Sequence, residues 1–338
     1  MKRLLARWGR PLLVAAGLLS IAYLCYEIGP RVVWDSIRTL GWRLVLVVWF
    51  PFVLAVVLDT LGWRVLVSDH AVPFGVLLRA RLAGEAVNLV TPTASVGGEP
   101  LKAYLIRPHV PLAEGLASVV ADKTTVVVGQ ILLLPVGLYL AMATLPLSHP
   151  LMVAMSALFA VQVLAVGAFI VVQTLGVFGG GGRVLGRLGR GPAERYQEGL
   201  NEVDRWLRRL YRERRGVLLL STLLHAAAWA TGALEIYLVL YFLGTDVSLV
   251  LSLVLETFGA AIRFASFMIP ASLGALEGGY VAIFKAFGFP GALGLSYMLV
   301  RRVREIVWAG LGLLWLAALR ARPTLDEAGE GLATGDPR

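Results

Sequence analysis

The chain of 338 residues contains one cysteine, Cys25, and only 16% of its residues are charged. A single cysteine excludes an internal disulfide bond and a metal site built from cysteines. The four histidines, His70, His109, His149 and His225, are widely separated, and none has the spacing of a metal-binding pair. The GxxxxGK loop of nucleotide-binding proteins and the GxSxG turn of hydrolases do not occur. The sequence therefore predicts no cofactor and no metal, and it favours a function other than catalysis.

Apolar residues are abundant, at 58% of the chain, which is well above the level of soluble globular proteins. A helix needs roughly 20 residues to cross about 30 Å of hydrocarbon, whereas barrel strands would be roughly ten-residue alternating segments. The apolar runs are long, continuous and rich in Leu, Val and Ala. They lie at 12–29, 43–61, 112–143, 151–178, 216–243, 247–269 and 291–319. We therefore predict an all-α, polytopic membrane helix bundle with about seven spans.

These spans form one expected transmembrane domain, 1–322. The segment that follows it, 323–338, is acidic and rich in glycine and has no apolar periodicity. Segments of this composition cannot bury enough apolar surface to fold. We expect a disordered tail.

Lysine and arginine are distributed unevenly between the connections. The segment 179–215 contains ten arginines, while 144–150 and 244–248 contain no lysine or arginine. Short cytoplasmic loops of membrane proteins carry the excess of positive charge. We expect the basic N-terminus and 179–215 to be cytoplasmic, and the two loops without lysine or arginine, together with the connection 30–43, to be external. The net charge of +9 then needs no nucleic acid partner, because this bias and anionic headgroups account for it.

The basic segment 179–215 also has an apolar pattern. After Pro192, apolar residues such as Val203 and Leu207 recur at helical spacing among the arginines. This pattern predicts an amphipathic cytoplasmic helix that ends near Arg215 and lies at anionic lipid headgroups. A regulatory lipid sensor is the less favoured interpretation.

Two segments interrupt the apolar pattern in the same way. In each, a proline is followed by small residues, glycine and, seven positions later, a glutamate: Pro92 to Glu99 and Pro270 to Glu277. Proline blocks a helix, and irregular backbone at membrane depth is tolerated only inside protein or along a polar cavity. We expect two broken or re-entrant helices and an internal repeat, as in transporters that bind substrate at interrupted helices. The helix-break residues are Pro92, Gly97, Gly98, Pro270, Gly274, Gly278 and Gly279.

The two glutamates have two interpretations. Each could cap the free N–H groups of a helix that starts beside it. Alternatively, each handles substrate or protons. We favour the second interpretation, because two such breaks in one chain exceed what packing requires.

Further charges lie inside the apolar spans. Arg301, Arg302 and Arg304 share a predicted helix with a single glutamate, Glu305. Three arginines exceed what one carboxylate neutralises, which favours an anionic ligand such as a phosphate headgroup over snorkelling to the interface. Glu256 and Arg263, seven positions apart on one helix face, either pair with partners in the bundle or take part in the site, and the sequence favours neither interpretation. Arg79, Arg81 and Glu85, with Lys102, are weaker candidates for an opposing wall. The substrate-binding candidates are Glu99, Lys102, Asp122, Lys123, Glu277, Arg301, Arg304 and Glu305.

Four blocks of sequence together resemble a known family. They are Gly98-Glu99-Pro-Leu-Lys102, Gly115-Leu-Ala-Ser-Val-Val-Ala-Asp-Lys-Thr124, Ile269-Pro-Ala-Ser-Leu-Gly-Ala-Leu-Glu-Gly-Gly-Tyr280 and Arg301-Arg-Val-Arg-Glu305. The chain resembles, over about 10–320, the flippase-like transmembrane family named after the membrane domain of lysylphosphatidylglycerol synthases. The last two blocks are most similar to its hopanoid-biosynthesis-associated subgroup. Many members have Arg-Gly-Glu in the first block and Glu-Arg in the third span, where this chain has Gly97-Gly98-Glu99 and Asp122-Lys123.

The resemblance implies a multi-pass protein of the bacterial cytoplasmic membrane that translocates or exports a lipid. The lipid would be a hopanoid, another isoprenoid or an anionic lipid, and lipid-biosynthesis enzymes are the expected partners. The alternative is a membrane-embedded lipid-modifying enzyme or its accessory, such as an aminoacyl-lipid synthase component or a polyprenyl-diphosphate phosphatase. For a phosphatase, Ser95 and Ser272 are the nearby hydroxyls.

Overall fold

A computed structural model describes residue 26 and residues 30–67, 72–90, 97–175 and 193–320. The predicted first span 12–29, the tail 323–338, Pro92 and Ser95 lie outside these residues. Within the described ranges all regular structure is helical and there is no strand. The predicted all-α class is thus confirmed.

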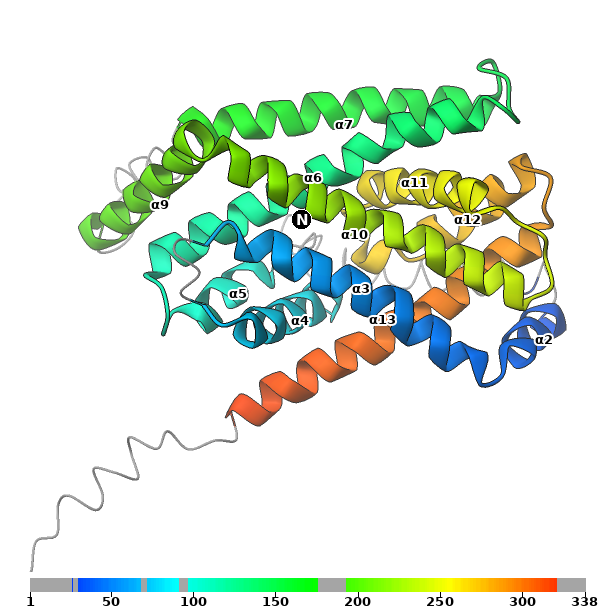
Figure 1. Cartoon of the computed structure of the whole chain (residues 1–338), viewed down its shortest axis with the longest axis horizontal. Coiled ribbons are helices and arrows are strands. Elements are labelled where there is room, and N and C mark those ends of the chain that lie inside the picture. Colours follow the sequence, from blue (N-terminus) through cyan, green and yellow to red (C-terminus); the bar gives the residue numbers. More distant parts are fainter. Residues whose placement is uncertain (1–25, 27–29, 68–71, 91–96, 176–192, 321–338) are drawn as a thin grey trace, which may run out of the picture.

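The helices are numbered as in Figure 1. Five long helices are α3 (Arg43–Arg64), α6 (Leu112–Ala141), α7 (Pro150–Leu175), α10 (Arg215–Phe242) and α13 (Gly291–Arg320). Shorter ones are α2 (Pro30–Leu40), α4 (Phe74–Val90), α5 (Glu99–Ile106), α9 (Ala193–Glu213), α11 (Leu249–Ala265) and α12 (Ala275–Ala286). The connection 30–43, which we expected as a loop, is therefore largely helical.

Four of the described helices, α3, α6, α7 and α10, are long and apolar enough to cross a membrane. They coincide with predicted spans at 43–61, 112–143, 151–178 and 216–243. The span predicted at 247–269 is a helix of only 17 residues, α11. The span predicted at 291–319 is α13, which is long but interrupted by the charges between Arg301 and Glu305. The structure thus supports four spans, and the larger number stays a prediction.

The long helices α3, α6, α7, α10 and α13 run roughly along the longest dimension of the molecule (Figure 1). The helix α10 packs against α3 and α6. A Cβ atom on Gly129 of α6 would lie only 2.8 Å from the backbone nitrogen of Ala226 on α10, so glycine permits this close approach. Such small residues bring helix backbones together in membranes, where lipid supplies no hydrophobic drive for association.

The predicted break after Pro270 is present. The helix α11 ends at Ala265, a single 3-10 turn, η2 (Pro270–Ser272), follows, and α12 begins at Ala275. Gly274 at the N-terminus of α12 has φ +77°, a conformation that favours glycine. The η2 turn packs against α4.

The structure describes the helices on both sides of the first predicted break. The helix α4 ends at Val90 and α5 starts at Glu99, with Pro100 in its first turn. Gly98, just before α5, lies so close to the backbone of Gly84 on α4 that a Cβ atom would overlap it. The helices α4 and α5 therefore form a tight pair, as α11 and α12 do.

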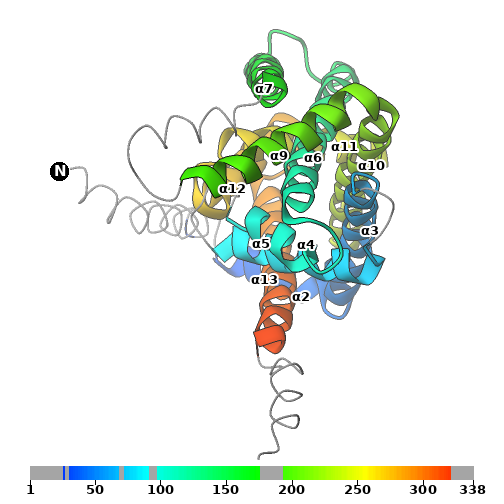
Figure 2. The ribbon, with the colours of Figure 1, turned by 90° about the vertical axis from the view of Figure 1, so that its left-hand side faces the viewer.

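The amphipathic helix predicted after Pro192 is α9. Its apolar stripe, Val203, Leu207 and Leu210, is buried against residues of α6 that include Ala117 and Ala121. The stripe therefore contacts protein rather than lipid, while arginines such as Arg208 remain exposed on the other side. Figure 2 shows α9 crossing the end of the bundle beside α6.

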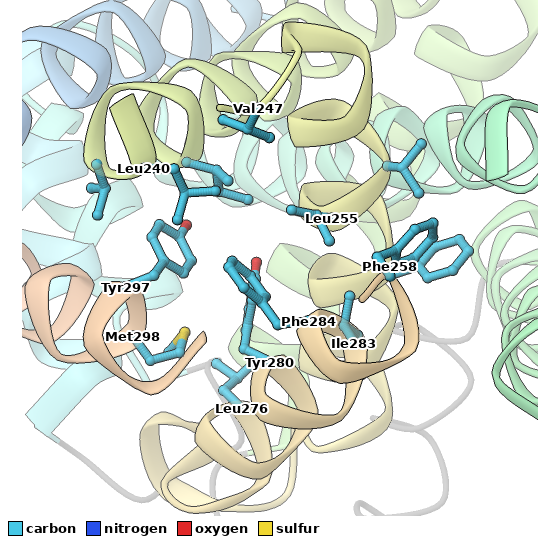
Figure 3. Close-up of a cluster of buried hydrophobic side chains, with 14 of the residues drawn as sticks. Leu240, Val247, Leu255, Phe258, Leu276, Tyr280, Ile283, Phe284, Tyr297 and Met298 are labelled. Carbon is cyan, nitrogen blue, oxygen red and sulfur yellow. The ribbon is translucent and has the colours of Figure 1, made fainter. Parts of the chain in front are cut away.

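The largest buried apolar cluster joins α10, α11, α12 and α13. It includes Leu240, Phe258, Phe284 and Tyr297, which face one another in Figure 3. Other large apolar side chains face outward, among them Leu164 and Leu175 of α7. An apolar exterior of this kind suits contact with lipid acyl chains.

Candidate functional site

A cavity of about 340 Å³ lies among α3, α4, α6, α10, α11 and α13. Its apolar lining includes Phe52 and Trp308, and α5 also contributes to the lining through Lys102. Eleven ionisable side chains line it: Asp59, Arg81, Glu85, Lys102, Asp122, Lys123, Glu256, Arg263, Arg301, Arg304 and Glu305. We call it the central cavity. A larger hollow of about 620 Å³ along the outer face of α3 is lined by apolar and aromatic residues alone. A pocket of about 360 Å³ beside α9 includes Glu114, Arg209 and Arg214, but the charged residues inside the bundle line the central cavity.

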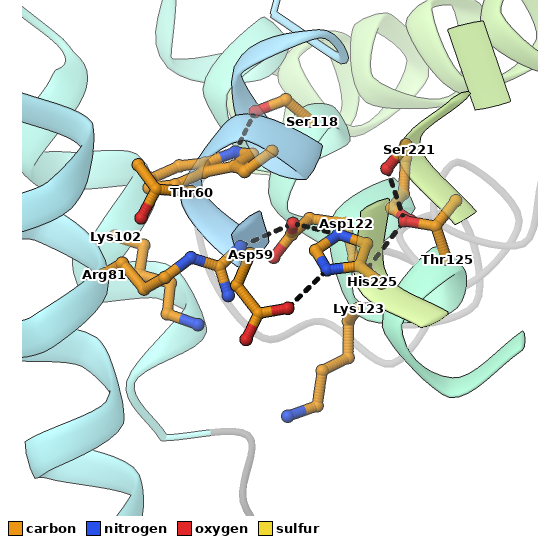
Figure 4. A network of polar contacts seen from close by, with 12 residues as sticks. Asp59, Thr60, Arg81, Lys102, Ser118, Asp122, Lys123, Thr125, Ser221 and His225 are labelled. Carbon is orange, nitrogen blue, oxygen red and sulfur yellow. Dashed lines mark hydrogen bonds and ion pairs between the residues drawn. The ribbon is translucent and has the colours of Figure 1, made fainter. Parts of the chain in front are cut away.

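One group of charges, the first cluster, comes from α3 to α6 and from α10. Its centre is Asp122 of α6, whose carboxylate accepts from Nη2 of Arg81 on α4 at 2.6 and 2.8 Å. The Nε2 atom of His225 lies 3.1 Å from the same carboxylate. On the other side of the ring, Nδ1 of His225 is 2.6 Å from Oδ1 of Asp59. Figure 4 shows the imidazole between the two carboxylates.

Lys102 of α5 holds the other part of the first cluster. Its ammonium lies 2.6 Å from Glu85 and 3.1 Å from Glu99. Glu99 also faces Lys123 at 3.4 Å and accepts from the amide of Asn88 at 3.1 Å. Three carboxylate–ammonium contacts therefore tie α4, α5 and α6 together.

A second cluster comes from α10 to α13. Arg301 makes a two-pronged contact with Glu256 of α11, with nitrogen–oxygen distances of 2.8 and 3.2 Å. The same guanidinium donates to the hydroxyl of Tyr297 at 2.7 Å, and Tyr280 donates to Glu256 at 3.0 Å. These side chains are all buried, so the pair is held by neighbours on three helices.

The remaining arginines of the second cluster are matched as well. Arg304 pairs with Glu235 of α10. Arg302 contacts Glu277 at 2.7 Å and Glu305 at 2.6 Å, and Arg263 contacts Glu305 at 3.0 Å. Four arginines thus face four carboxylates. The excess of arginines over carboxylates from which we predicted an anionic ligand is therefore not present in the structure, because Glu235, Glu256 and Glu277 come from other helices.

The two glutamates at the helix breaks differ. Glu277 accepts from the backbone N–H of Gly274 at 2.8 Å, so it combines a helix cap with an ion pair. Glu99 stands at the start of α5, but there the backbone N–H of Gly98 donates to Oδ1 of Asn88 at 2.7 Å, so Asn88 takes the role that Glu277 has at α12. Both carboxylates are buried in ion pairs, and neither faces the lipid.

The structure brings all eight substrate-binding candidates into the two clusters. Glu99, Lys102, Asp122 and Lys123 belong to the first cluster. The second holds Glu277, Arg301, Arg304 and Glu305. Arg79 is exposed and joins neither. Among the helix-break residues, Gly279 packs against Ile262, and Gly278 has open space around its Cα.

Sequence reasoning missed three members of the clusters: Asp59, His225 and Glu235. Each is an isolated polar residue inside a long apolar run, which was the available signal, because such residues are costly in a membrane unless they are paired. The hydroxyl of Ser272, proposed as a nucleophile of the enzyme alternative, donates to the carbonyl of Ser266 at 3.4 Å and does not line the central cavity.

A metal site is absent from the part of the chain that the structure describes, where no three His, Cys, Asp or Glu side chains are grouped to hold an ion. The two clusters instead place charged side chains along the cavity. Among the residues that line the cavity, the side chains of Glu85, Lys123, Arg263 and Asp59 are 49%, 35%, 29% and 28% exposed. Both signs of charge therefore reach the cavity.

The chain is similar in sequence to known membrane proteins. The model of the lysylphosphatidylglycerol synthase TM region matches residues 11–316. The chain belongs to this family. It is also 24% identical to a UPF0104 membrane protein of Methanothermobacter thermautotrophicus, over 86% of this chain and 90% of that protein. No solved structure matches. As a member of the lysylphosphatidylglycerol synthase TM region family, the chain is a membrane protein, and this membership fits a lipid-related role.

Proposed function

We propose that the protein translocates a lipid across the membrane, with the headgroup in the central cavity and the apolar tail in the surrounding bilayer. A single observation carries the proposal: charges from both clusters line one cavity inside a bundle whose outer surface is apolar. A charged headgroup loses its hydration when it enters hydrocarbon, at a cost of many kcal/mol. A path already lined by fixed charges reduces that cost.

The proposed headgroup carries a phosphate. Lys123 and Arg263 are the most exposed cations of the two clusters, and each has one carboxylate partner within salt-bridge distance. Phosphate is the ligand that such cations bind well. The buried arginines contribute too, since Nε of Arg301 and Nε of Arg304 have no hydrogen-bond acceptor among the described residues. The exposed Asp59 and Glu85 suit a headgroup that also bears hydroxyl or amine donors.

The expected hopanoid substrate is a narrower form of this proposal. A hopanoid with an uncharged headgroup would leave the exposed cations, Lys123 and Arg263, without an anionic ligand. We therefore propose a phosphate-bearing lipid first and a hopanoid second.

Reconstitution tests the proposal. The full chain is placed in phosphatidylcholine vesicles with a trace of fluorescent phosphatidylglycerol, phosphatidylcholine or a hopanoid, and dithionite quenching reports the outer-leaflet fraction over time. We expect the protein to speed the movement of the phosphatidylglycerol probe. The Lys123→Gln, Arg263→Gln double variant should slow it at least tenfold, since the loss of even one hydrogen bond to a charged group costs about 1.5–3 kcal/mol and about 1.4 kcal/mol is a factor of ten.

The matched control is Lys285→Gln, which removes an exposed lysine at the end of α12, away from the cavity. It should move lipid at the unmodified rate. Equal rates with and without protein for every probe would refute translocation. If the protein speeds the movement of the hopanoid probe alone, the substrate is a hopanoid and not a phosphate-bearing lipid.

We also propose an orientation with the α9 end in the cytoplasm. In Figure 1, α9 and the end of α13 lie at one end of the bundle, and the turns after α6 and α10 lie at the other. This arrangement supports a cytoplasmic side for the basic helix α9, opposite to the turns that carry no lysine or arginine. In a variant lacking Cys25, Ser148→Cys should react with an impermeant thiol reagent in intact spheroplasts, and Gly199→Cys only after lysis. The reverse pattern would invert the orientation.

A further inference from the structure

The imidazole of His225 is fully buried between two carboxylates on different helices. Its Nδ1 lies 2.6 Å from Asp59 on α3, and its Nε2 lies 3.1 Å from Asp122 on α6, without the alignment of a straight hydrogen bond. Gly62 makes this position available, because a Cβ atom there would lie 2.7 Å from Nε2. The ring therefore sits in a space shaped for it.

The two carboxylates beside the imidazole of His225 favour a proton on each of its ring nitrogens. A neutral histidine has one N–H and one acceptor nitrogen, so one ring nitrogen would face a carboxylate with its lone pair. An imidazolium presents an N–H to both sides. The geometry thus favours the ring with both nitrogens protonated.

The surrounding charges lead to the same conclusion. Facing the first cluster are Asp59 on α3, Arg81 and Glu85 on α4, Glu99 and Lys102 on α5, and Asp122 and Lys123 on α6. Among these described groups, four carboxylates face three permanent cations. A proton on His225 makes the balance four to four. The second cluster is already balanced by its four arginines.

We propose that His225 is a proton-binding site whose occupancy is coupled to that of the headgroup in the central cavity; the coupling rests on the proposed function. With the proton bound, the first cluster is neutral and admits an anionic headgroup beside Lys123. Without it, the cluster carries one unmatched negative charge and repels the anion. Proton and headgroup therefore move together.

Asp59 provides the route for the proton. Its side chain is 28% exposed and lines the cavity, whereas His225 does not. The Nδ1–H proton passes to the carboxylate of Asp59, which leaves neutral imidazole and neutral Asp59. The carboxylic acid then releases the proton to cavity water and regains its charge. Loading follows the reverse order.

The first experiment measures the proton alone. In full-length protein labelled with ¹⁵N-histidine and reconstituted in phosphatidylcholine vesicles, His225→Gln identifies the resonances of His225 by their loss. Both ring nitrogens should show imidazolium shifts at the acid end of the range from about pH 5 to 8 and lose one proton within it. A ring that stays neutral across this range would overturn the proposal, whether or not lipid moves.

The second experiment measures the coupling. A pH gradient of either sign is imposed across the vesicles, and the rate for the fluorescent phosphatidylglycerol is divided by the rate without a gradient. This ratio should differ several-fold between the two signs in the unmodified protein and be close to one in His225→Gln. The control His109→Gln, which removes an exposed histidine, should keep the unmodified ratio.

Asp59→Asn is the second variant, to be used if His225→Gln does not fold. It keeps the imidazole of His225 and removes the carboxylate that accepts its proton. Its ratio should also be close to one. A ratio near one in the unmodified protein, with lipid still moving, overturns the coupling but leaves the proposed function intact. If no lipid probe moves at all, the proposed function is refuted. The ¹⁵N chemical shifts of His225 then decide by themselves whether the ring binds a proton.

Discussion

The two clusters obtain their positive charge from different side chains. The first uses one arginine, two lysines and a histidine, whereas the second uses four arginines. Arginine keeps its charge at every physiological pH and presents a rigid fork, while lysine is a point charge on a flexible stem and histidine titrates near neutrality. The second cluster therefore forms a fixed wall of the cavity, and the first forms the wall whose charge can change.

The clusters also differ in how they are supported. Tyrosine hydroxyls surround the Arg301–Glu256 pair, and both ions are buried. In the first cluster, Lys102 is buried but its partner Glu85 is about half exposed. Loss of one charge should therefore cost more in the Arg301–Glu256 pair than in first-cluster pairs that have an exposed partner, whereas the Arg81–Asp122 pair of the first cluster is as buried as Arg301–Glu256. The following changes test this difference.

The largest effect should come from Arg301→Gln. It leaves the buried Glu256 without its cation, and breaking a buried pair in this way costs about 3–5 kcal/mol. SDS titration in dodecylmaltoside micelles measures the free energy of unfolding. The double variant with Glu256→Gln should recover most of the loss, because no charge is left unmatched. Normal stability of Arg301→Gln would show that the pair is not the support described here.

The two break glutamates give the next comparison. Glu277→Ala removes both a cap and the contact with Arg302, whereas Glu99→Ala removes no cap and leaves Lys102 paired with Glu85. Glu277→Ala should therefore be the more destabilising by about 1–2 kcal/mol, the worth of a helix cap. Glu277→Gln keeps a cap-forming side chain and should lie between them. Equal losses in the same titration would contradict the distinction.

Gly62→Ala tests the fit of His225 between α3 and α6. The added methyl must displace the imidazole, and overpacking of this kind costs about 1–3 kcal/mol. Gly278→Ala is the matched control in α12, because nothing lies within 4 Å of its Cβ position. That change should be neutral or stabilise by up to about 1 kcal/mol, as alanine in helices does. A stable Gly62→Ala protein would mean that the ring has room to move.

The smallest effects on stability should come from the partly exposed cations. Lys123→Gln and Arg263→Gln should each change the free energy of unfolding by less than about 1 kcal/mol, since exposed ion pairs contribute little. This keeps their effect on lipid movement separate from folding. If either variant unfolds as readily as Arg301→Gln, its loss of transport cannot be assigned to the headgroup.

The class of protein and its long helices follow from the sequence because an apolar run of helical length is a local signal. The break at Pro270 is local for the same reason, since proline and glycine act on their own backbone. Pairing is different. Arg304 meets Glu235 across 69 positions and Arg301 meets Glu256 across 45, so packing of distant helices decides which carboxylate neutralises which arginine.

The same limit explains the overlooked residues. Asp59 and His225 are separated by 166 positions, and each by itself is only a polar residue in an apolar helix. The apolar stripe of α9 was visible, but not its partner, because lipid headgroups and the small residues of α6 suit such a stripe equally well.

The equal numbers of arginines and glutamates in the second cluster have an evolutionary consequence. A lineage that replaces Arg304 alone would keep Glu235 as a buried, uncompensated charge and lose stability. Replacement of both partners by apolar side chains is far less costly. The four arginines and four glutamates should therefore change in couples among related chains, and a family tree should show Glu235 and Arg304 lost or gained on the same branch.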